Sequence, residues 1–305
     1  MRERSRPRAL LAVRSIEANV TTMDEHPTTT IGILHPGAMG AAIGASARQA
    51  GARVLWVSEG RSTQTAARAE EAGLVDVHWL NGLVNQSRIV VSVCPPHAAE
   101  EMAKEVALVG YEGLYVDANA IAPASARRVC DIVEARGASF VDGGIIGPPP
   151  WRPGTTRLYL SGEAAPKVAR YFEGGPLEVQ VLDAPVGVAS ALKMAYAAYT
   201  KGTSALLAAI IALAEHEGVH DALFAEWRRG DQDLAAEYAQ RVRAAAPKAW
   251  RYAGEMDEVA ATFAAAGLPS GFHEAAAAVY RRLEAYKDDS DPPSAEELAR
   301  ALLGD

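Results

Sequence analysis

Cysteine is almost absent from this 305-residue chain, which contains only Cys94 and Cys130. Two separated cysteines cannot build a disulfide framework or a clustered Cys/His metal site. The histidines do not supply such a site either, because the one pair spaced by four residues, His216 and His220, is interrupted by Gly218. We therefore expect no bound metal and a reducing, cytoplasmic location.

The chain also lacks an excess of basic residues. Its 30 Lys and Arg are outnumbered by 38 Asp and Glu, which gives a formal net charge of −8. Nucleic-acid-binding proteins concentrate Lys and Arg on one face, so we expect no nucleic acid partner. The longest apolar runs are interrupted by Lys, Glu or His, and we therefore expect no membrane-spanning segment and no membrane partner.

The N-terminus carries no convincing secretory signal. Met1–Arg8 is basic, but the apolar run Ala9–Val13 is shorter than a usual signal-peptide core, and Arg14 follows it directly. We interpret residues 1–28 as a disordered extension, with Met23 as an alternative start.

From Thr29 onward, short apolar runs alternate with longer Ala-, Glu- and Arg-rich stretches. This alternation is typical of parallel strands joined by crossover helices, and it predicts an α/β fold with a doubly wound, mostly parallel Rossmann sheet. The predicted strands are Ile31–Leu34, Arg53–Val57, Ile89–Val93, Leu114–Asp117 and Ser139–Asp142. The predicted helices between them are Ala41–Ala50, Ser62–Ala72, Ala98–Val109 and Ala124–Arg136.

The second part of the chain has a different character. Thr156–Ser161 and Val179–Leu182 complete a mixed sheet, with an amphipathic segment at Pro166–Phe172 between them. A long helical run, Ala189–His216, then opens an Ala-rich region that is helical to its end, with breaks at Gly218, Gly230, Pro247, Gly267 and Pro292. We predict a dinucleotide-binding domain at residues 29–186 and an all-helical substrate and dimerisation domain at residues 187–305.

A glycine-containing loop follows the first predicted strand. A helix N-terminus offers free amides and a positive dipole end, and glycines let a phosphate approach the backbone. His35 replaces the first glycine of the usual dinucleotide fingerprint, so a plain strand-to-helix turn is the competing interpretation. The residues expected to contact the cofactor here are Pro36, Gly37, Ala38, Met39 and Gly40.

The second strand ends at the distance where a dinucleotide ribose is usually contacted. Glu59 could accept hydrogen bonds from a ribose 2′-hydroxyl, whereas Arg61 with Ser58 and Ser62 could hold a 2′-phosphate. The alternative for Arg61 is a solvated residue at the start of a helix. We favour NADP (NADPH) over NAD.

The third strand runs into Cys94, Pro95 and Pro96, and the two prolines should fix a loop at the carboxyl edge of the sheet, near the cofactor. Cys94 could act as a nucleophile with His97, but a small buried residue at a strand end is the more ordinary interpretation.

Taken in order, these segments resemble the beta-hydroxyacid dehydrogenase family, which includes relatives of 6-phosphogluconate dehydrogenase and 3-hydroxyisobutyrate dehydrogenase. The resemblance covers about residues 30–215. The family's Gly-Leu-Gly-x-Met-Gly loop matches His35–Gly40, and its Asp-x-Ser-Thr-x-x-Pro stretch is echoed by Asp117–Pro123, which includes Asn119. Its Asp-Ala-Pro-Val-Ser-Gly-Gly substrate segment falls on Asp142–Pro148, and its Gly-Thr-Leu strand is echoed by Gly154–Gly162.

The resemblance implies a catalytic lysine in a Gly-x-x-x-x-x-Lys helix, here Gly187–Lys193. In such enzymes the ammonium exchanges a proton with the reacting oxygen while the nicotinamide exchanges hydride. The residue itself supports this role, because Lys193 interrupts an apolar helix where a buried cation is costly unless it is paired or functional. The alternative is a lysine that extends along the helix to water.

The chain departs from the family pattern in the substrate region. The family's Asn after the lysine is Ala197, so Tyr196, Thr200 or Lys201 would have to replace it. The family's Ser and second Gly are Ile146 and Pro148, which points to a larger, more apolar or differently held substrate. The resemblance and these substitutions together place substrate contacts at Asn119, Gly144, Ile145, Ile146, Gly147, Trp151, Tyr196 and Thr200.

We therefore expect an NADP(H)-dependent oxidoreductase that acts on a carbonyl or hydroxyl group of a small molecule. The alternatives are an imine reductase, because relatives with this architecture reduce C=N bonds, and a non-catalytic nucleotide-binding protein. The resemblance and the long apolar helix also imply a homodimer.

Overall fold

The computed structural model describes residues 13–14, 29–229 and 234–304 and divides the chain into two compact units. The first unit extends to Ser190, apart from 95–97 and 120–122, which cluster with the second unit, 191–305. The division falls four residues after the predicted boundary at 186. The reason is local: the first turn of the long helix is hydrogen-bonded to the sheet unit.

The first unit contains a nine-stranded sheet in the order β1-β9-β8-β7-β6-β5-β2-β3-β4. The predicted Rossmann-type sheet is confirmed, because the pairings from β7 through β6, β5, β2 and β3 to β4 are all parallel. It is mixed, since β7–β8 and β1–β9 are antiparallel. The strands are β1 (Val13–Arg14), β2 (Thr30–Ile33), β3 (Arg53–Trp56), β4 (Val75–Asp76), β5 (Ile89–Ser92), β6 (Leu114–Asp117), β7 (Ser139–Ile146), β8 (Arg157–Ser161) and β9 (Glu178–Leu182).

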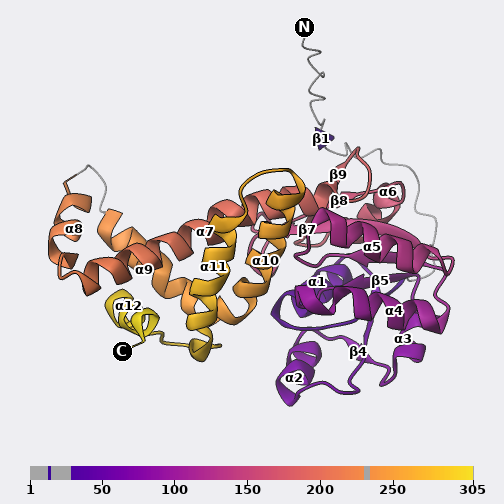
Figure 1. Ribbon diagram of the computed structural model, residues 1–305. Helices are drawn as coiled ribbons and strands as arrows, with labels where there is room; N and C mark the ends of the chain where they lie inside the picture. Colours follow the sequence, from indigo (N-terminus) through magenta and orange to yellow (C-terminus); the bar gives the residue numbers. More distant parts are fainter. Residues whose placement is uncertain (1–12, 15–28, 230–233, 305) are drawn as a thin grey trace, which may run out of the picture. The chain divides into compact units, whose positions relative to one another are not determined.

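Helices pack against the sheet of this unit, and α4 and α5 lie side by side on it (Figure 1). They are α1 (Ala38–Gln49), α2 (Thr63–Glu71), α3 (Leu80–Gln86), α4 (Ala99–Val109), α5 (Pro123–Glu134) and α6 (Ala165–Ala169), with a 3₁₀ turn η2 (Arg170–Phe172). The core consists of the fully buried apolar strand residues, such as Ile31, Val91 and Val116, and small residues of α1. The sequence prediction missed β4 and α3.

Strand β1 lies within the range predicted to be a disordered extension. The other residues of that range, Met23 included, lie outside the described residues.

The second unit is helical, as predicted. It contains most of α7 (Val188–His216), then α8 (His220–Trp227), α9 (Leu234–Ala245), α10 (Ala249–Ala265), α11 (Gly271–Arg282) and α12 (Ala295–Leu303), with 3₁₀ turns η1 (Pro96–Ala98), η3 (Ala246–Lys248) and η4 (Glu284–Tyr286). Helices α10 and α11 run side by side (Figure 1). Four of the five predicted breaks fall between α-helices, and Gly230 lies outside the described residues.

Helix α7 is a longer apolar segment than we expected anywhere in the chain. Its most apolar window has a mean hydropathy of 1.4, so by length and composition alone the helix is long and apolar enough to cross a membrane. In the structure, 44% of that window is buried, and buried Met194 and Ile211 pack in the core of the helical unit. A core helix meets the same test of length and composition, so the expectation of no membrane-spanning segment stays a prediction.

Candidate functional site

The loop between β2 and α1 has the geometry of a phosphate-binding turn. Gly37 immediately precedes α1, and its carbonyl oxygen accepts a hydrogen bond from the Ala41 amide at 2.9 Å. A Cβ atom on Gly40 would collide with the carbonyl oxygen of His35, so only glycine allows this close approach. A Cβ on Gly37 would meet no atom within 4 Å, so the space above the loop is open. Pro36–Gly40 therefore present a helix N-terminus to an accessible space.

His35 and Arg61 lie together beside this loop. Arg61 donates from Nη2 to the carbonyl oxygen of Leu34 at 3.4 Å, which places the guanidinium next to the glycine turn. Burial and the Arg61 charge lower the pKa of His35 to about 4, so its imidazole is neutral at pH 7. His35 Nδ1 and Arg61 Nε are buried and have no hydrogen-bond partner among the described residues. These two nitrogens fit the edge of a site for a polar, phosphate-bearing group.

The other residues predicted to contact the ribose already have partners. The Ser58 hydroxyl lies 3.1 Å from His78 Nδ1, and Ser62 Oγ caps α2 by accepting a hydrogen bond from the Thr65 amide at 3.2 Å. Glu59 is exposed. Arg61 is therefore the one member of this predicted set whose side chain is tucked against the glycine loop.

Asn119 holds the loop that contains Cys94. Its side-chain oxygen accepts the Cys94 amide at 2.5 Å, and its Nδ2 donates to Ser92 Oγ and to Asp117 Oδ2 at 3.0 and 2.8 Å. Asn119 is 2% exposed, and these bonds use both ends of its amide. The structure thus gives Asn119 a positioning role, and its direct contact with cofactor or substrate stays a prediction.

Partial burial disfavours Cys94 as a nucleophile. It raises the pKa of the thiol to about 12, and the Cys94 Sγ lies 3.7 Å from Ser92 Oγ. A buried neutral thiol is a poor nucleophile, which agrees with the ordinary interpretation of this cysteine. Pro95 and Pro96, which follow it, cluster with the helical unit.

Part of the predicted substrate loop is strand. Gly144, Ile145 and Ile146 belong to β7, where they pair with Tyr159, Leu158 and Arg157 of β8. Antiparallel pairing with β8 draws this segment into the sheet and buries the Ile145 and Ile146 side chains, and their contact with substrate stays a prediction. Gly147 follows with φ of +126°, and Trp151 in the next loop is 52% exposed.

Asp142, the first residue of that segment, has a structural role. Its fully buried carboxylate accepts hydrogen bonds from Ser161 Oγ and the Gly187 amide at 2.9 Å each. It also accepts the Ser190 amide at 3.1 Å and the Ser190 hydroxyl at 2.6 Å. A carboxylate at a helix N-terminus is favoured by the helix dipole, so Asp142 fixes the first turn of α7 against the sheet.

Lys193, the candidate catalytic lysine, lies on α7 three residues after Ser190. Burial, with a smaller effect from Arg251, lowers the pKa of Lys193 to about 8. An amine with this pKa exchanges protons readily near neutral pH, as a general acid/base must.

The three residues considered as replacements for the family's Asn differ in their surroundings. Tyr196 is 45% exposed. The Thr200 hydroxyl donates to the Tyr196 carbonyl oxygen at 3.0 Å. Lys201 forms an ion pair with Glu255 in which both side chains are largely buried, and its Nζ lies 4.7 Å from the centre of the Tyr252 ring. Burial, with the charges of Lys193 and Arg251, lowers the pKa of Lys201.

Sequence reasoning missed Arg251, Tyr252 and Glu255, the residues of α10 around these lysines. The only signal was spacing, because positions 251 and 255 lie on one face of a helix, but nothing local indicates that α7 packs against that face. Among the described residues, no group of three or more His, Cys, Asp or Glu is arranged to hold a metal ion.

Two domain families match the chain. Residues 30–165 match the NAD binding domain of 6-phosphogluconate dehydrogenase, and residues 214–283 match a domain of unknown function. A curated relative, the uncharacterized 28.5 kDa protein in the 7S RNA 5′ region of Methanothermus fervidus, is 30% identical over 165 residues. That match covers 54% of this chain and 63% of the relative, which is less than two thirds of its length.

Solved structures share the fold. A conserved protein of unknown function, described as structurally similar to 3-hydroxyacid dehydrogenases, is 25% identical with a TM-score of 0.62 over 84% of this chain and 97% of its own. The 3-hydroxyisobutyrate dehydrogenase of Mycobacterium tuberculosis, solved with L-serine, is 18% identical with a TM-score of 0.67, covering 90% and 99%. A reductive aminase of Aspergillus terreus, solved with NADPH and ethyl levulinate, is 18% identical with a TM-score of 0.53, covering 90% and 99%.

The buried ion pair between Lys201 and Glu255 gives a stability prediction. Changing Glu255 to Gln leaves a buried cation without its partner, so we expect the free energy of unfolding to fall by about 3 kcal/mol. Asp257→Asn is the matched control on the same helix, since its pair with Arg281 is half exposed and should contribute less than about 1 kcal/mol. Urea denaturation followed by circular dichroism measures both. Equal effects of the two substitutions would contradict the prediction.

Proposed function

Because residues 30–165 are an NAD-binding domain of the 6-phosphogluconate dehydrogenase type, we propose that the chain is an NADP(H)-dependent oxidoreductase. It transfers hydride between the nicotinamide and a carbonyl or hydroxyl carbon of a small organic substrate, and Lys193 is its general acid/base. The observation that carries the proposal is the open glycine turn at Gly37 and Gly40, with Arg61 placed against its base.

The residues at this turn fit a dinucleotide. Amides at the N-terminus of α1 face the open space, and the Arg61 guanidinium is the nearby cation that could pair with a ribose 2′-phosphate. His35 stays neutral there and places no second positive charge under the loop. The Arg61 guanidinium lies against the glycine turn whereas Glu59 is exposed, and this difference favours NADP over NAD.

Lys193 supplies the proton chemistry. The bound nicotinamide supplies or accepts the hydride at the reacting carbon. In the reducing direction, the protonated Lys193 Nζ donates its proton to the substrate oxygen, and the neutral amine then regains a proton from solvent. In the oxidising direction, the neutral amine removes the hydroxyl proton. A pKa near 8 keeps both forms of Lys193 populated in the neutral to mildly alkaline range.

Nucleotide binding is the first test. We expect a fluorescence titration to detect NADPH binding, and Arg61→Ala to weaken it at least about tenfold while NADH binding changes little, because only NADPH carries the 2′-phosphate. Arg53→Ala, which removes an exposed arginine of β3, is the control and should leave both affinities unchanged. If neither nucleotide binds the native protein, the oxidoreductase proposal is wrong and a non-catalytic role takes its place.

Lys193 should set the pH dependence of turnover. With any carbonyl compound that a substrate screen finds to be reduced, we expect the rate to fall as pH rises through about 8, since the protonated amine is the acid. Oxidation of the corresponding alcohol should rise over the same range. Lys193→Met should lower kcat by about 10²- to 10⁴-fold without loss of NADPH binding, whereas Lys104→Met, which changes an exposed side chain of α4, should not lower kcat.

Two outcomes of that experiment separate the alternatives. Turnover of imines but not of ketones, with Lys193→Met retaining activity, would favour imine reduction. An unchanged pH profile in Lys193→Met would exclude this lysine as the acid/base.

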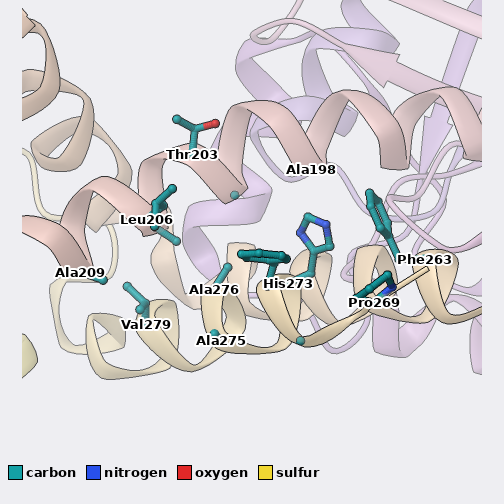
Figure 2. Close-up of a pocket in the computed structure, with 14 residues that line it drawn as sticks. Ala198, Thr203, Leu206, Ala209, Phe263, Pro269, His273, Ala275, Ala276 and Val279 are labelled. Carbon is teal, nitrogen blue, oxygen red and sulfur yellow. The ribbon is translucent and has the colours of Figure 1, made fainter.

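The assembly that we propose is a homodimer formed through α7. The helix exposes large apolar side chains at a spacing of three, four or seven residues: Leu192, Tyr196, Tyr199, Leu206 and Leu213, which are 36 to 67% exposed. Leu206 also lines an apolar groove of about 720 Å³ between α7 and α11, together with Val279 and Ala276 (Figure 2). A heptad-spaced stripe on one helix is self-complementary, so a second copy of the chain is the occupant that fits it.

Charging the stripe should separate the subunits. We expect size-exclusion chromatography with light scattering to find a dimer for the native protein at micromolar concentration and a monomer for the double variant Leu206→Glu/Leu213→Glu. Leu108→Glu, at a 77% exposed position of α4, is the control and should remain dimeric. A native monomer at that concentration would rule out the proposed interface.

A further inference from the structure

Basic side chains from two helices converge in the helical unit. Lys193 and Lys201 belong to α7, and Arg251 belongs to α10. Lys248 directly precedes the first residue of α10. Two of these cations lie over the Tyr252 ring, with Lys201 Nζ at 4.7 Å and Arg251 Cζ at 5.6 Å from its centre. The charge of Arg251 also acts on Lys193 and Lys248.

The carboxylates near this cluster are already used. Glu255 pairs with Lys201, and Glu258, one turn further along α10, accepts the Ala122 amide at 2.6 Å. Tyr280 completes the surroundings, but its hydroxyl donates to the Lys201 carbonyl oxygen at 2.7 Å. The cluster as a whole keeps an excess of positive charge.

Arg251 is the cation of this cluster with an unused buried donor. Its Nε is buried and has no hydrogen-bond partner among the described residues. Arg251 also forms none of the ion pairs seen in the described part of the chain. Its charge nevertheless acts on its neighbours, because it contributes to the lowered pKa values of Lys193, Lys201 and Lys248.

A buried donor of a charged group that lacks an acceptor is costly, and an anionic ligand removes this cost. Guanidinium is the side chain best suited to such a ligand, because its planar fork matches the two oxygens of a carboxylate or phosphate.

We propose that Arg251 anchors an oxyanion-binding site in the helical unit, which holds a carboxylate or phosphate group of the substrate beside Lys193. The statement that the oxyanion belongs to the substrate rests on the function proposed above. The existence of the anion-binding site does not rest on that function, because its residues all lie in one unit and can be tested without nucleotide.

The site predicts that an anion at Arg251 alters the protonation of Lys193. Propionate serves as the carboxylate probe and inorganic phosphate as the other, each compared with sodium chloride at equal ionic strength. Competitive labelling with acetic anhydride, read by peptide mass spectrometry over a pH series, reports the pKa of each lysine. Neutralising the charge of Arg251 should raise the pKa of Lys193. At pH values below that pKa, each rise of one pKa unit lowers the labelling rate about tenfold.

We expect one or both probes to slow the labelling of Lys193 in the native protein, and the stronger probe identifies the chemical class of the ligand. In Arg251→Met the labelling should start slower and respond at least about tenfold more weakly to the probe, whereas Arg251→Lys should keep part of the response. Arg281→Met, at an exposed ion pair of α11, and Lys104 in every sample are the controls. Circular dichroism establishes that the variants are folded.

The result that overturns the site is labelling of Lys193 that neither anion changes in the native protein, or a response that persists unchanged in Arg251→Met. This failure is separate from failure of the proposed function, which an NADPH titration of the same preparation detects. Anion binding without NADPH binding would keep the site and remove the oxidoreductase.

Discussion

The carboxylate of Asp142 is the interaction on which the arrangement of α7 depends. Asp142 is the last residue of β7 that pairs with β6 and the first that pairs with β8. Its carboxylate accepts hydrogen bonds from Ser161, Gly187 and Ser190. These bonds fix where the helix begins and hold its first turn against the sheet. A buried, fully hydrogen-bonded charge is stable only in one geometry, so it defines a single start for this 29-residue helix.

Burial acts on ionisable groups differently in the two units. In the sheet unit it keeps His35 and Cys94 neutral, so Arg61 is the cation that lies beside the glycine turn. In the helical unit Lys201 is paired with Glu255, and burial brings the pKa of Lys193 toward neutrality. The same desolvation thus acts on the proposed phosphate site in one unit and on the proposed proton donor in the other.

Much of the fold could be predicted because its signals are local. Apolar runs such as Ile31–Leu34 and Ile89–Val93 identify the parallel strands within one residue of their observed ends. The missed elements carry weak signals: β4 is two exposed residues, and α3 contains Asn81, Gly82 and Asn85, which are poor helix formers. The end of one strand was predicted too early, at Asp142, for another reason, since only pairing with β8, more than ten residues away, extends that strand to Ile146.

The sequence by itself determined the class of fold, the glycine turn, and the lysine that interrupts an apolar helix, because each depends on residues close together in the chain. Only the tertiary structure decided the state of that lysine and its neighbours. Glu255 lies 54 residues from Lys201, and Asn119 lies 25 residues from the Cys94 amide that it holds. Burial, charge pairing and the acceptor that Arg251 Nε lacks depend on such distant contacts, and no local pattern encodes them.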